Sequence, residues 1–317
     1  MFVDLCYNKN MEFDKILAGH ADNEHTGVTV ILAPEGVTAG VCVRGAAPGT
    51  RETDLLRSEK TVDKINAVVL AGGSAFGLDA CCGVMRWLRE KNCGFDTGYH
   101  RVPIVSGAVL YDLKPGGFAF PNAGMGYEAC QNAKVLSFKN GKPRSVNGGA
   151  AGAGKRARCG RILGFEASQQ AGIGFACVEA GGIAAAAVIA VNALGDVYDN
   201  KTGKIVAGAR LPDGKFLDAG AFVLSGELLK MKEQMKSGTN TVIGAVITNA
   251  KLTKLECNKL AEYAHDGLVL SIKPAHTEMD GDTLFALSAG DIEAEFNTLC
   301  VMAAEAVRLA VLNSVKG

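Results

Sequence analysis

The sequence predicts a mixed α+β fold in a single domain. Apolar, β-branched runs dominate the first half of the chain, and apolar residues at helical spacing recur after residue 73 and in the last quarter. These strands and helices follow one another in mixed order, without the strict alternation of a doubly wound sheet, which favours layered α+β packing. The 317 residues contain no internal repeat and no low-complexity linker, so we expect one domain over residues 1–317.

The first half is expected to form strands at 27–34 (GVTVILAP) and 36–45 (GVTAGVCVRG), joined by a hairpin at Pro34-Glu35. A third strand, 65–73 (INAVVLAGG), leads into a helix whose apolar residues have helical spacing. These residues are Leu78, Cys81, Met85 and Leu88. The stretch 102–113 (VPIVSGAVLYDL) is expected to be a bent strand or a strand pair. The Gly/Asn/Pro-rich sequence that follows, up to about residue 144, is expected to be irregular.

The second half begins with two strands, 172–180 and 183–199, turning at Gly181-Gly182. A polar segment with a turn at Asp213-Gly214 then leads to a strand at 241–250 (TVIGAVITNA) and a helix for which Asn249 is the candidate cap. A strand at 282–290 and a C-terminal helix complete the chain. The apolar stripes of the two helices are Leu252, Leu255, Leu260, Ala264 and Leu268, and Ile292, Phe296, Leu299, Ala303, Val307 and Ala310.

Charge and composition narrow the range of partners. Lys and Arg together number 33, as do Asp and Glu, so we expect neither a nucleic acid nor a membrane surface as partner. The N-terminus lacks a secretory pattern, and the apolar stretch 181–194 is too short to span a bilayer, so we expect a cytoplasmic protein. The ten cysteines contain no CxxC and are expected to be reduced, and the five scattered histidines do not suggest a metal site.

Two glycine-rich turns are candidate anion sites. AGGSAFGLDA (71–80) lies at a strand-to-helix turn, but its spacing fits neither the dinucleotide fingerprint nor the GxSxG elbow around Ser74. The plainer interpretation is close packing by the glycines, with Ser74 capping the helix. VNGGAAGAGKRARCG (146–160) carries Lys155, Arg156 and Arg158, yet no Lys-Ser/Thr follows its glycines in P-loop fashion.

Polar residues at four other places are candidates for chemistry. Asp280 and Asp282 flank Gly281, and residues two apart in extended chain project to the same side, where crowding would raise the pKa of one carboxyl. Asn192 follows an apolar run and needs hydrogen-bond partners if buried. A solvated turn for the aspartates and a backbone contact for Asn192 remain alternatives. His265-Asp266 is interpreted as a polar helix end before Gly267, and His276 as a loop residue.

Thr241 is the first residue of its strand, directly after the polar Thr239-Asn240. If the Asn240-Thr241 bond were cut, Thr241 would carry both a hydroxyl and a free α-amine. An α-amine has a reference pKa of about 7.7–8.0 and can act as the base for that hydroxyl near neutral pH. An N-terminal threonine is a known variant of the nucleophile-plus-base arrangement, and it needs no histidine.

Several blocks over nearly the whole chain carry a family resemblance. They include TGVTVILAPEGVTAGVCVRG, AVVLAGGSAFGLDACCGVMRWL, GGAAGAGKRARCGRILG, VIAVNALGDV, NTVIGAVITNAKLTK and HTEMDGDTLFAL, in this order. With these blocks the sequence resembles the family of L-aminopeptidase/D-alanine esterase, the β-peptidyl aminopeptidases and the nylon-oligomer endohydrolases. That resemblance implies an N-terminal-nucleophile hydrolase with a four-layer α/β/β/α sandwich, self-cleaved into two associated chains.

The resemblance also assigns roles to individual residues. Cleavage would fall between Asn240 and Thr241, giving an α-chain of 1–240 and a β-chain of 241–317, with Thr241 as nucleophile. Asn192 matches the asparagine that stabilises the oxyanion, Asp280 and Asp282 the polar pair beside the nucleophile, and Tyr111 a tyrosine lining the pocket. Gln170 stands where relatives usually have a lysine, for which Lys155 is the candidate substitute.

The expected activity is hydrolysis of a small peptide or linear amide substrate, as in an aminopeptidase or nylon-oligomer hydrolase, with no cofactor. We expect a homo-oligomer of cleaved heterodimers. Two alternatives remain at this point: an uncleaved, catalytically impaired binding or scaffold relative, and a serine hydrolase that uses Ser74.

Overall fold

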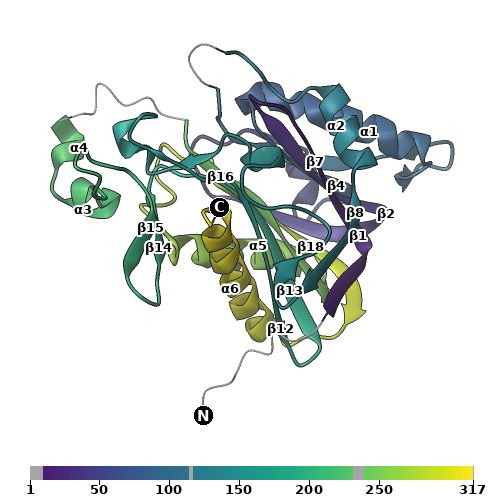
Figure 1. Cartoon of the computed structure of the whole chain (residues 1–317). Coiled ribbons are helices and arrows are strands. Elements are labelled where there is room, and N and C mark those ends of the chain that lie inside the picture. Colours follow the sequence, from purple (N-terminus) through teal and green to yellow (C-terminus); the bar gives the residue numbers. More distant parts are fainter. Residues whose placement is uncertain (1–9, 114–116, 231–238, 317) are drawn as a thin grey trace.

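The computed structural model describes residues 10–113, 117–230 and 239–316. Its main feature is an 11-stranded mixed sheet with the order β12-β13-β16-β18-β2-β1-β8-β9, to which β4, β7 and β3 attach beside β2. The strands of this sheet are β1 (Asn10–Asp22), β2 (Gly27–Val43), β3 (Thr50–Arg51), β4 (Lys64–Ala71), β7 (Val105–Val109), β8 (Lys134–Lys139), β9 (Lys142–Pro143), β12 (Ile173–Ala180), β13 (Ile183–Asn192), β16 (Thr241–Ala250) and β18 (Thr283–Ile292). The mixed α+β fold predicted from the sequence is confirmed, with helices flanking the sheet (Figure 1).

The long strand β2 corrects one prediction. Pro34-Glu35 does not form a hairpin: the chain continues as one strand with a register shift between Leu32 and Val37, where Gly36 adopts a φ of 77°. Residues before the shift pair with β1 and β4. After the shift, Val37 and Thr38 still pair with β4, and Thr38 to Val43 pair with β18. Proline lacks an N–H for the ladder, and the bulge accommodates it. β2 therefore belongs to both halves of the sheet.

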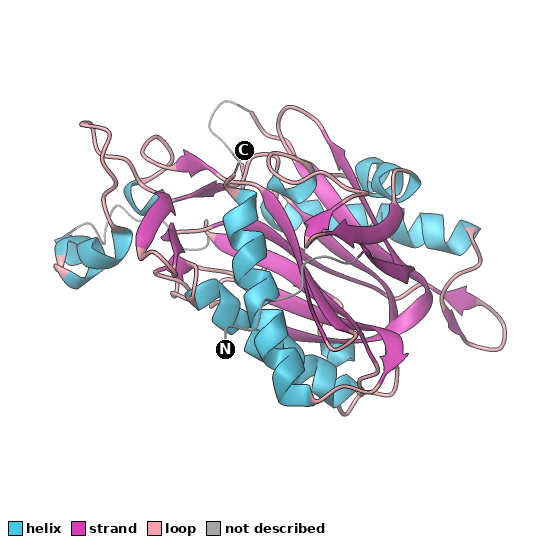
Figure 2. Ribbon diagram, turned by 60° about the horizontal axis from the view of Figure 1, so that its bottom comes forward, coloured by secondary structure: helices cyan, strands magenta, loops and turns pink. Residues whose placement is uncertain are grey.

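Three apolar cores explain the layering. One core lies between the two halves of the sheet and joins Phe13, Leu70 and Phe138 to Phe175 and Phe285. A second packs β12, β13, β16 and β18 against α5 (Lys254–Val269) and α6 (Phe296–Ser314). A third packs β1, β2 and β4 against α1 (Ala80–Glu90) and α2 (Ala123–Gln131). The helices thus cover the sheet on both outer sides (Figures 1 and 2).

The helix α5 starts later than its candidate cap. Thr253, not Asn249, is the N-cap, and Thr253 and Glu256 form a reciprocal capping box. Asn249 instead holds the turn of the β12–β13 hairpin, accepting from the Ala184 N–H (2.8 Å) and donating to the Gly182 carbonyl (2.9 Å). The hairpin itself is confirmed, with Gly181 and Gly182 both at positive φ.

Several elements were not expected from the sequence. The region predicted to be irregular contains α2 and β8, and β1 precedes the first predicted strand. Short elements lie around the sheet; they are β5 (Phe95–Asp96), β6 (Arg101–Val102), β10 (Arg158–Cys159), β11 (Gln169–Gln170), β14 (Asp196–Asp199), β15 (Lys204–Ala207), β17 (Ile272–Lys273), α3 (Ala219–Leu224) and α4 (Glu227–Lys230). By length and composition α6 could cross a membrane, but 56% of its apolar window is buried in the core, so this is weak evidence for a span.

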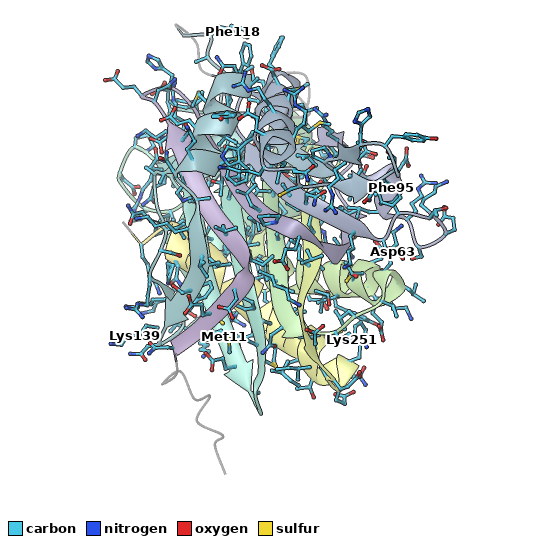
Figure 3. The ribbon with its side chains drawn as sticks, turned by 90° about the vertical axis from the view of Figure 1, so that its right-hand side faces the viewer. Met11, Asp63, Phe95, Phe118, Lys139 and Lys251 are labelled. Atoms are coloured by element: carbon cyan, nitrogen blue, oxygen red, sulfur yellow. The ribbon has the colours of Figure 1, made fainter. Side chains whose placement is uncertain are left out.

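Three phenylalanines among the described residues form an aromatic cluster. Phe76, Phe118 and Phe120 contact one another with ring centroids 5.0–5.6 Å apart, and Phe118 is 66% exposed. Phe118 lies at the end of the molecule that carries α1 and α2, opposite Met11 and Lys139 (Figure 3).

Candidate active site

Thr241 begins the central strand β16 and is buried, with 4% of its surface exposed. β16 runs antiparallel to β13, where Asn192 is the register partner of Thr241, and parallel to β18. The preceding Asn240 forms an isolated bridge to Asp280, in the loop before β18. Two neighbouring strands therefore bring Asn192 and the aspartate loop to the same end of β16. Ser237 and Gly238, just upstream, lie outside the described residues.

The carbonyl of Asn240 is polarised by two donors. The Gly281 N–H donates to this oxygen at 3.0 Å, and the Thr241 hydroxyl donates to the same oxygen. Gly281 leaves no room for a side chain, since a β-carbon would lie 2.6 Å from the Ala47 carbonyl oxygen and 2.9 Å from Thr241 Oγ1. The loop thus places a backbone donor and the threonine hydroxyl at one peptide carbonyl, as an oxyanion site requires.

Asp280 is buried and held by one neighbour. Its Oδ2 accepts from the Thr277 N–H (2.8 Å) and the Thr277 hydroxyl (2.6 Å). Burial, followed by the nearby Asp282 carboxylate, raises the pKa of Asp280 to about 6. A carboxyl with such a pKa can accept or release a proton near neutral pH. Thr277 was missed by the sequence reasoning, although it lies within the same HTEMDGD segment.

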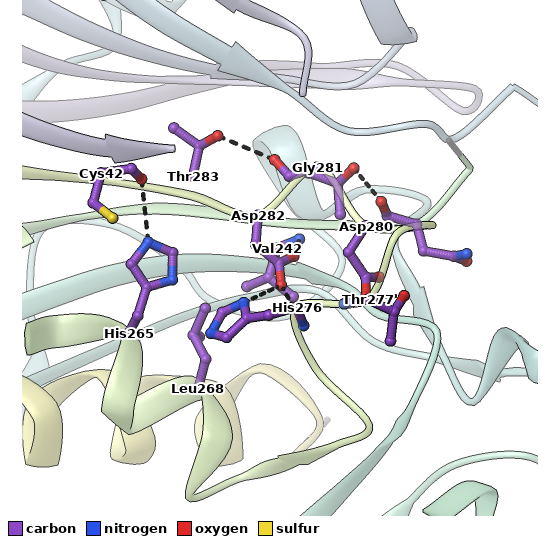
Figure 4. Close-up of polar contacts among 12 residues, drawn as sticks. Cys42, Val242, His265, Leu268, His276, Thr277, Asp280, Gly281, Asp282 and Thr283 are labelled. Atoms are coloured by element: carbon purple, nitrogen blue, oxygen red, sulfur yellow. Dashed lines mark hydrogen bonds and ion pairs between the residues drawn. The ribbon is translucent and has the colours of Figure 1, made fainter. Parts of the chain in front are cut away.

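Asp282 joins this loop to the start of β16. Its Oδ1 accepts from the Val242 N–H at 2.7 Å, and its Oδ2 accepts from the backbone N–H (3.2 Å) and the ring Nδ1 (2.7 Å) of His276 (Figure 4). The two aspartates do lie beside Thr241, so they are not a solvated turn. His276 was interpreted as a plain loop residue, and the structure shows that it also contacts Asp282.

Asn192 is fully buried and all of its polar atoms have partners. Its Nδ2 donates to the carbonyls of Tyr111 (3.0 Å) and Thr239 (3.2 Å). Its Oδ1 accepts from Arg161 Nη1 (2.7 Å) and from the Arg158 N–H (3.2 Å). Asn192 therefore contacts the residue before Asn240 rather than the Asn240 carbonyl. Its role as oxyanion donor stays a prediction.

The guanidinium group of Arg161 places a positive charge beside Asn192, and this residue was not predicted from the sequence. Besides Asn192, its Nη1 reaches the Tyr111 carbonyl at 3.0 Å. Burial lowers the pKa of Arg161 to about 10, so it remains charged at neutral pH. Tyr111 is placed beside Asn192 through its backbone, and the pocket role of its side chain stays a prediction. The only feature of the sequence that could have indicated Arg161 is its position directly after the glycine-rich stretch 146–160.

Gln170 and Lys155 make contacts of another kind. Gln170 is exposed, and its amide donates to the carbonyls of Ala157 (3.0 Å) and Ala171 (2.7 Å). The Lys155 ammonium is paired with Asp22 at 2.9 Å. Among the contacts of the described residues, neither side chain reaches Thr241, so Arg161 is the better candidate for the cation near the site.

Both glycine-rich turns hold carboxylates of the protein itself. The Gly73 N–H donates to Asp112 at 2.6 Å, and the Gly152 N–H donates to Asp22 at 2.9 Å. In both turns the anion that the glycine N–H group binds is therefore an aspartate side chain of the protein itself. Ser74 does not cap a helix: Gly73 is the N-cap of the 3-10 turn Ser74–Asp79, without a side-chain hydrogen bond.

His265 corrects another prediction. It is not part of a polar helix end, because α5 continues to Val269 and His265 is fully buried within it. Its Nε2 contacts the Cys42 carbonyl at 3.1 Å, and its ring lies 4.9 Å from the His276 ring, edge to face. Helical periodicity places residue 265 beside the buried Ala261 and Leu268, a signal that was available in the sequence.

Comparison with known proteins gives consistent results. Residues 11–316 match the model of peptidase family S58. An uncharacterized aminopeptidase of Mycobacterium leprae (strain TN) is 42% identical over 270 residues, covering 84% of this chain and 72% of that protein. A 6-aminohexanoate-oligomer endohydrolase of Agromyces sp. (strain KY5R) is 30% identical over 277 residues, covering 87% of this chain and 73% of that protein.

Two solved structures share the fold. The L-aminopeptidase D-Ala-esterase/amidase of Ochrobactrum anthropi, described as a variant of the Ntn hydrolase fold, superposes with a TM-score of 0.67 over 97% of this chain and 87% of that chain, at 16% identity. A β-aminopeptidase of Burkholderia sp. gives a TM-score of 0.64 over the same shares, 97% and 87%, at 20% identity. At these identities the likeness concerns the fold.

Proposed function

The chain belongs to peptidase family S58, and from this premise we propose that it is a self-processing amide hydrolase in which Thr241 becomes an N-terminal nucleophile. The observation that carries the proposal is the geometry at the Asn240 carbonyl. Its oxygen accepts from the Gly281 N–H and the Thr241 hydroxyl, and the backbone of Asp280 pairs with that of Asn240 in an isolated β-bridge.

The first reaction is cleavage of the Asn240–Thr241 bond. Thr241 Oγ1 attacks the Asn240 carbonyl carbon, and Asp280, whose pKa is raised to about 6, takes the hydroxyl proton. The Gly281 N–H holds the developing oxyanion. The C–N bond then breaks with return of the proton to the amine, and water hydrolyses the resulting ester. The products are chains of residues 1–240 and 241–317.

The second reaction uses the amine that cleavage creates. A free α-amine has a reference pKa of about 7.7–8.0, so the amine of Thr241 takes the proton from its own hydroxyl as that hydroxyl attacks a substrate carbonyl. In the uncut chain the Asn192 amide is used by the Thr239 carbonyl. Movement of residues 239–240 after cleavage frees this donor for the substrate oxyanion, which would explain why Asn192 contacts Thr239 rather than Asn240.

The substrate class is inferred from the relatives. An aminopeptidase and a 6-aminohexanoate-oligomer endohydrolase both cleave amide bonds near an amino-acid unit. We therefore propose a small peptide with a free amine, or an amide or oligomer of a β- or ω-amino acid, as substrate.

The test compares Thr241 variants on a substrate panel. Wild type, Thr241→Ser and Thr241→Ala are assayed on p-nitroanilides of L-, D- and β-amino acids and on 6-aminohexanoate oligomers. We expect activity to appear in step with cleavage, to persist in part with serine and to vanish with alanine. Undiminished activity in Thr241→Ala would contradict the proposal.

A further inference from the structure

His276 lies in the loop between β17 and β18 in a left-handed conformation, with a φ of 57°. This conformation is uncommon for residues other than glycine, although asparagine, aspartate and histidine adopt it more often than the others. The His276 side chain is only 9% exposed. The buried side chain and the uncommon backbone conformation together fix where the ring lies, so the contacts of the ring show what it can hold in place.

Those contacts converge on one oxygen. Both the backbone N–H and the ring Nδ1 of His276 reach Asp282 Oδ2, at 3.2 and 2.7 Å. This leaves Asp282 Oδ1 free to accept from the Val242 N–H at 2.7 Å (Figure 4). Because the carboxyl accepts N–H groups on both oxygens, the His276 ring is a donor through Nδ1. The two hydrogen bonds to Oδ2 fix the side-chain rotamer of Asp282. The fixed rotamer in turn places Oδ1 where it accepts from the Val242 N–H.

The histidine behind it contributes no charge. The Cys42 carbonyl can only accept, so His265 carries its proton on Nε2 and a lone pair on Nδ1. Burial lowers the pKa of His265 to about 4, which keeps it neutral at neutral pH. His265 Nδ1 and His276 Nε2 both lack partners, and with Asn240 Oδ1 they are the buried side-chain atoms without a partner among the described residues. Unpaired polar atoms are thus concentrated at this site, where they can be functional.

We propose that His276 is a positioning residue: it orients Asp282 so that Asp282 holds the Val242 peptide, and with it Thr241, in the reactive position. The inference rests on the proposed function. After cleavage the only covalent attachment of Thr241 to the protein is its peptide bond to Val242. The hydrogen bond from Val242 to Asp282 therefore restrains the nucleophile directly. His276 itself does not touch the reacting atoms.

Two variants separate the side-chain donor from the backbone conformation. Asparagine and glycine both tolerate a positive φ, but only asparagine supplies an N–H donor close to the place of Nδ1. His276→Asn and His276→Gly are therefore a matched pair. Cleavage rate, kcat, KM and melting temperature are measured for both, after denaturing mass analysis has shown wild type to be two chains with Thr241 at the new N-terminus.

We expect His276→Asn to stay within about threefold of wild type in cleavage rate and kcat. His276→Gly is expected to lower both by about 10–100-fold, the range for losing a hydrogen bond to a charged group, with KM changed less than about threefold. A purely structural role would lower the melting temperature of both variants without this split between kcat and KM.

A second readout does not depend on turnover. In the uncut Thr241→Ala background, amide exchange at Val242 should be faster by about tenfold or more in His276→Gly than in His276→Asn, with Val246 in the same strand unchanged. Equal exchange at Val242, or a normal kcat in His276→Gly, would overturn the positioning role while leaving the proposed function intact. An intact, inert wild-type chain would overturn the proposed function and the catalytic part of this inference together.

Discussion

At Gly281 the facing Ala47 carbonyl and the Thr241 hydroxyl exclude a β-carbon, which would lie within 2.9 Å of both oxygens. The same residue supplies the N–H that reaches the Asn240 carbonyl. Glycine is thus required for close approach at the bond whose cleavage we propose. The sequence indicated the two flanking aspartates, but this role of the glycine depends on contacts that only the folded chain creates.

Gly281→Ala is expected to slow self-cleavage by at least about tenfold, because the loop must shift and lengthen the hydrogen bond to the oxyanion. The measurement is the time course of two-chain product on denaturing gels. Gly220→Ala is the matched control, since its β-carbon would find its nearest neighbour at 3.4 Å and should leave cleavage unchanged. Equal rates in the two variants would contradict the role given to Gly281.

The ionised side chain of Asp280 is expected to lower the free energy of unfolding, because its pKa is raised in the folded protein. Its pKa in the folded protein, about 6, lies above the ordinary value of 3.8. The contribution of this group to the free energy of unfolding is therefore fully present below about pH 4 and is lost as the pH rises to about 6. At 1.36 kcal/mol per pKa unit the loss is at most about 3 kcal/mol above pH 6. In the uncut Thr241→Ala background, Asp280→Asn should therefore raise the free energy of unfolding at pH 7, with a gain that shrinks towards pH 4.

Urea unfolding at both pH values checks this, and a loss of stability at pH 7 would refute it. In the otherwise wild-type chain, Asp280→Asn should also slow cleavage, because an amide cannot take the hydroxyl proton. The cleavage rate of the wild type should fall as pH drops below about 6, where Asp280 becomes protonated.

At the scale of elements, long apolar strands could be predicted from the sequence, but the strands with which they pair could not. The strands β16 and β18 could be read from the sequence as continuous apolar runs, because both faces of each strand are buried in a core. The two C-terminal helices could be read from the apolar stripe that each of them buries. The bend in β2 could not, since Pro34 followed two residues later by a glycine fits a hairpin and a bulge equally well. The register of Asn192 against Thr241 is likewise a long-range fact, set by the sheet.

Asn249 illustrates how tertiary contacts override a local signal. Asn249→Ala should lower the free energy of unfolding by about 1–2 kcal/mol, because it removes hydrogen bonds to both Ala184 and Gly182. Cleavage should be unaffected, since Asn249 lies at the opposite end of β16 from Thr241. Urea unfolding in the Thr241→Ala background tests this, with the exposed neighbour Lys251→Ala as control. Equal stabilities would mean that the hairpin turn does not depend on Asn249.

At the scale of the molecule, the proposed nucleophile Thr241 lies on a strand in the middle of the sheet. Residues 241–317 supply β16 and β18, which pair with β13 and β2 of the preceding part of the chain, and α5 and α6, which cover them. After cleavage at Thr241 the two chains should therefore remain bound, because separation would break ladders on both sides and expose a core. Size-exclusion chromatography of the matured protein should give one peak containing both chains. Two separate peaks would contradict this.

The most direct measurement of the central claim is denaturing mass analysis of the purified protein, with wild type and Thr241→Ala side by side. The proposal predicts two wild-type chains, the smaller beginning at Thr241, and a single chain for the variant. An intact wild type that still hydrolyses esters would point to Ser74, and an intact, inert one to a binding or scaffold role. Either result, or a smaller chain beginning at any other residue, would contradict Thr241 as the N-terminal nucleophile.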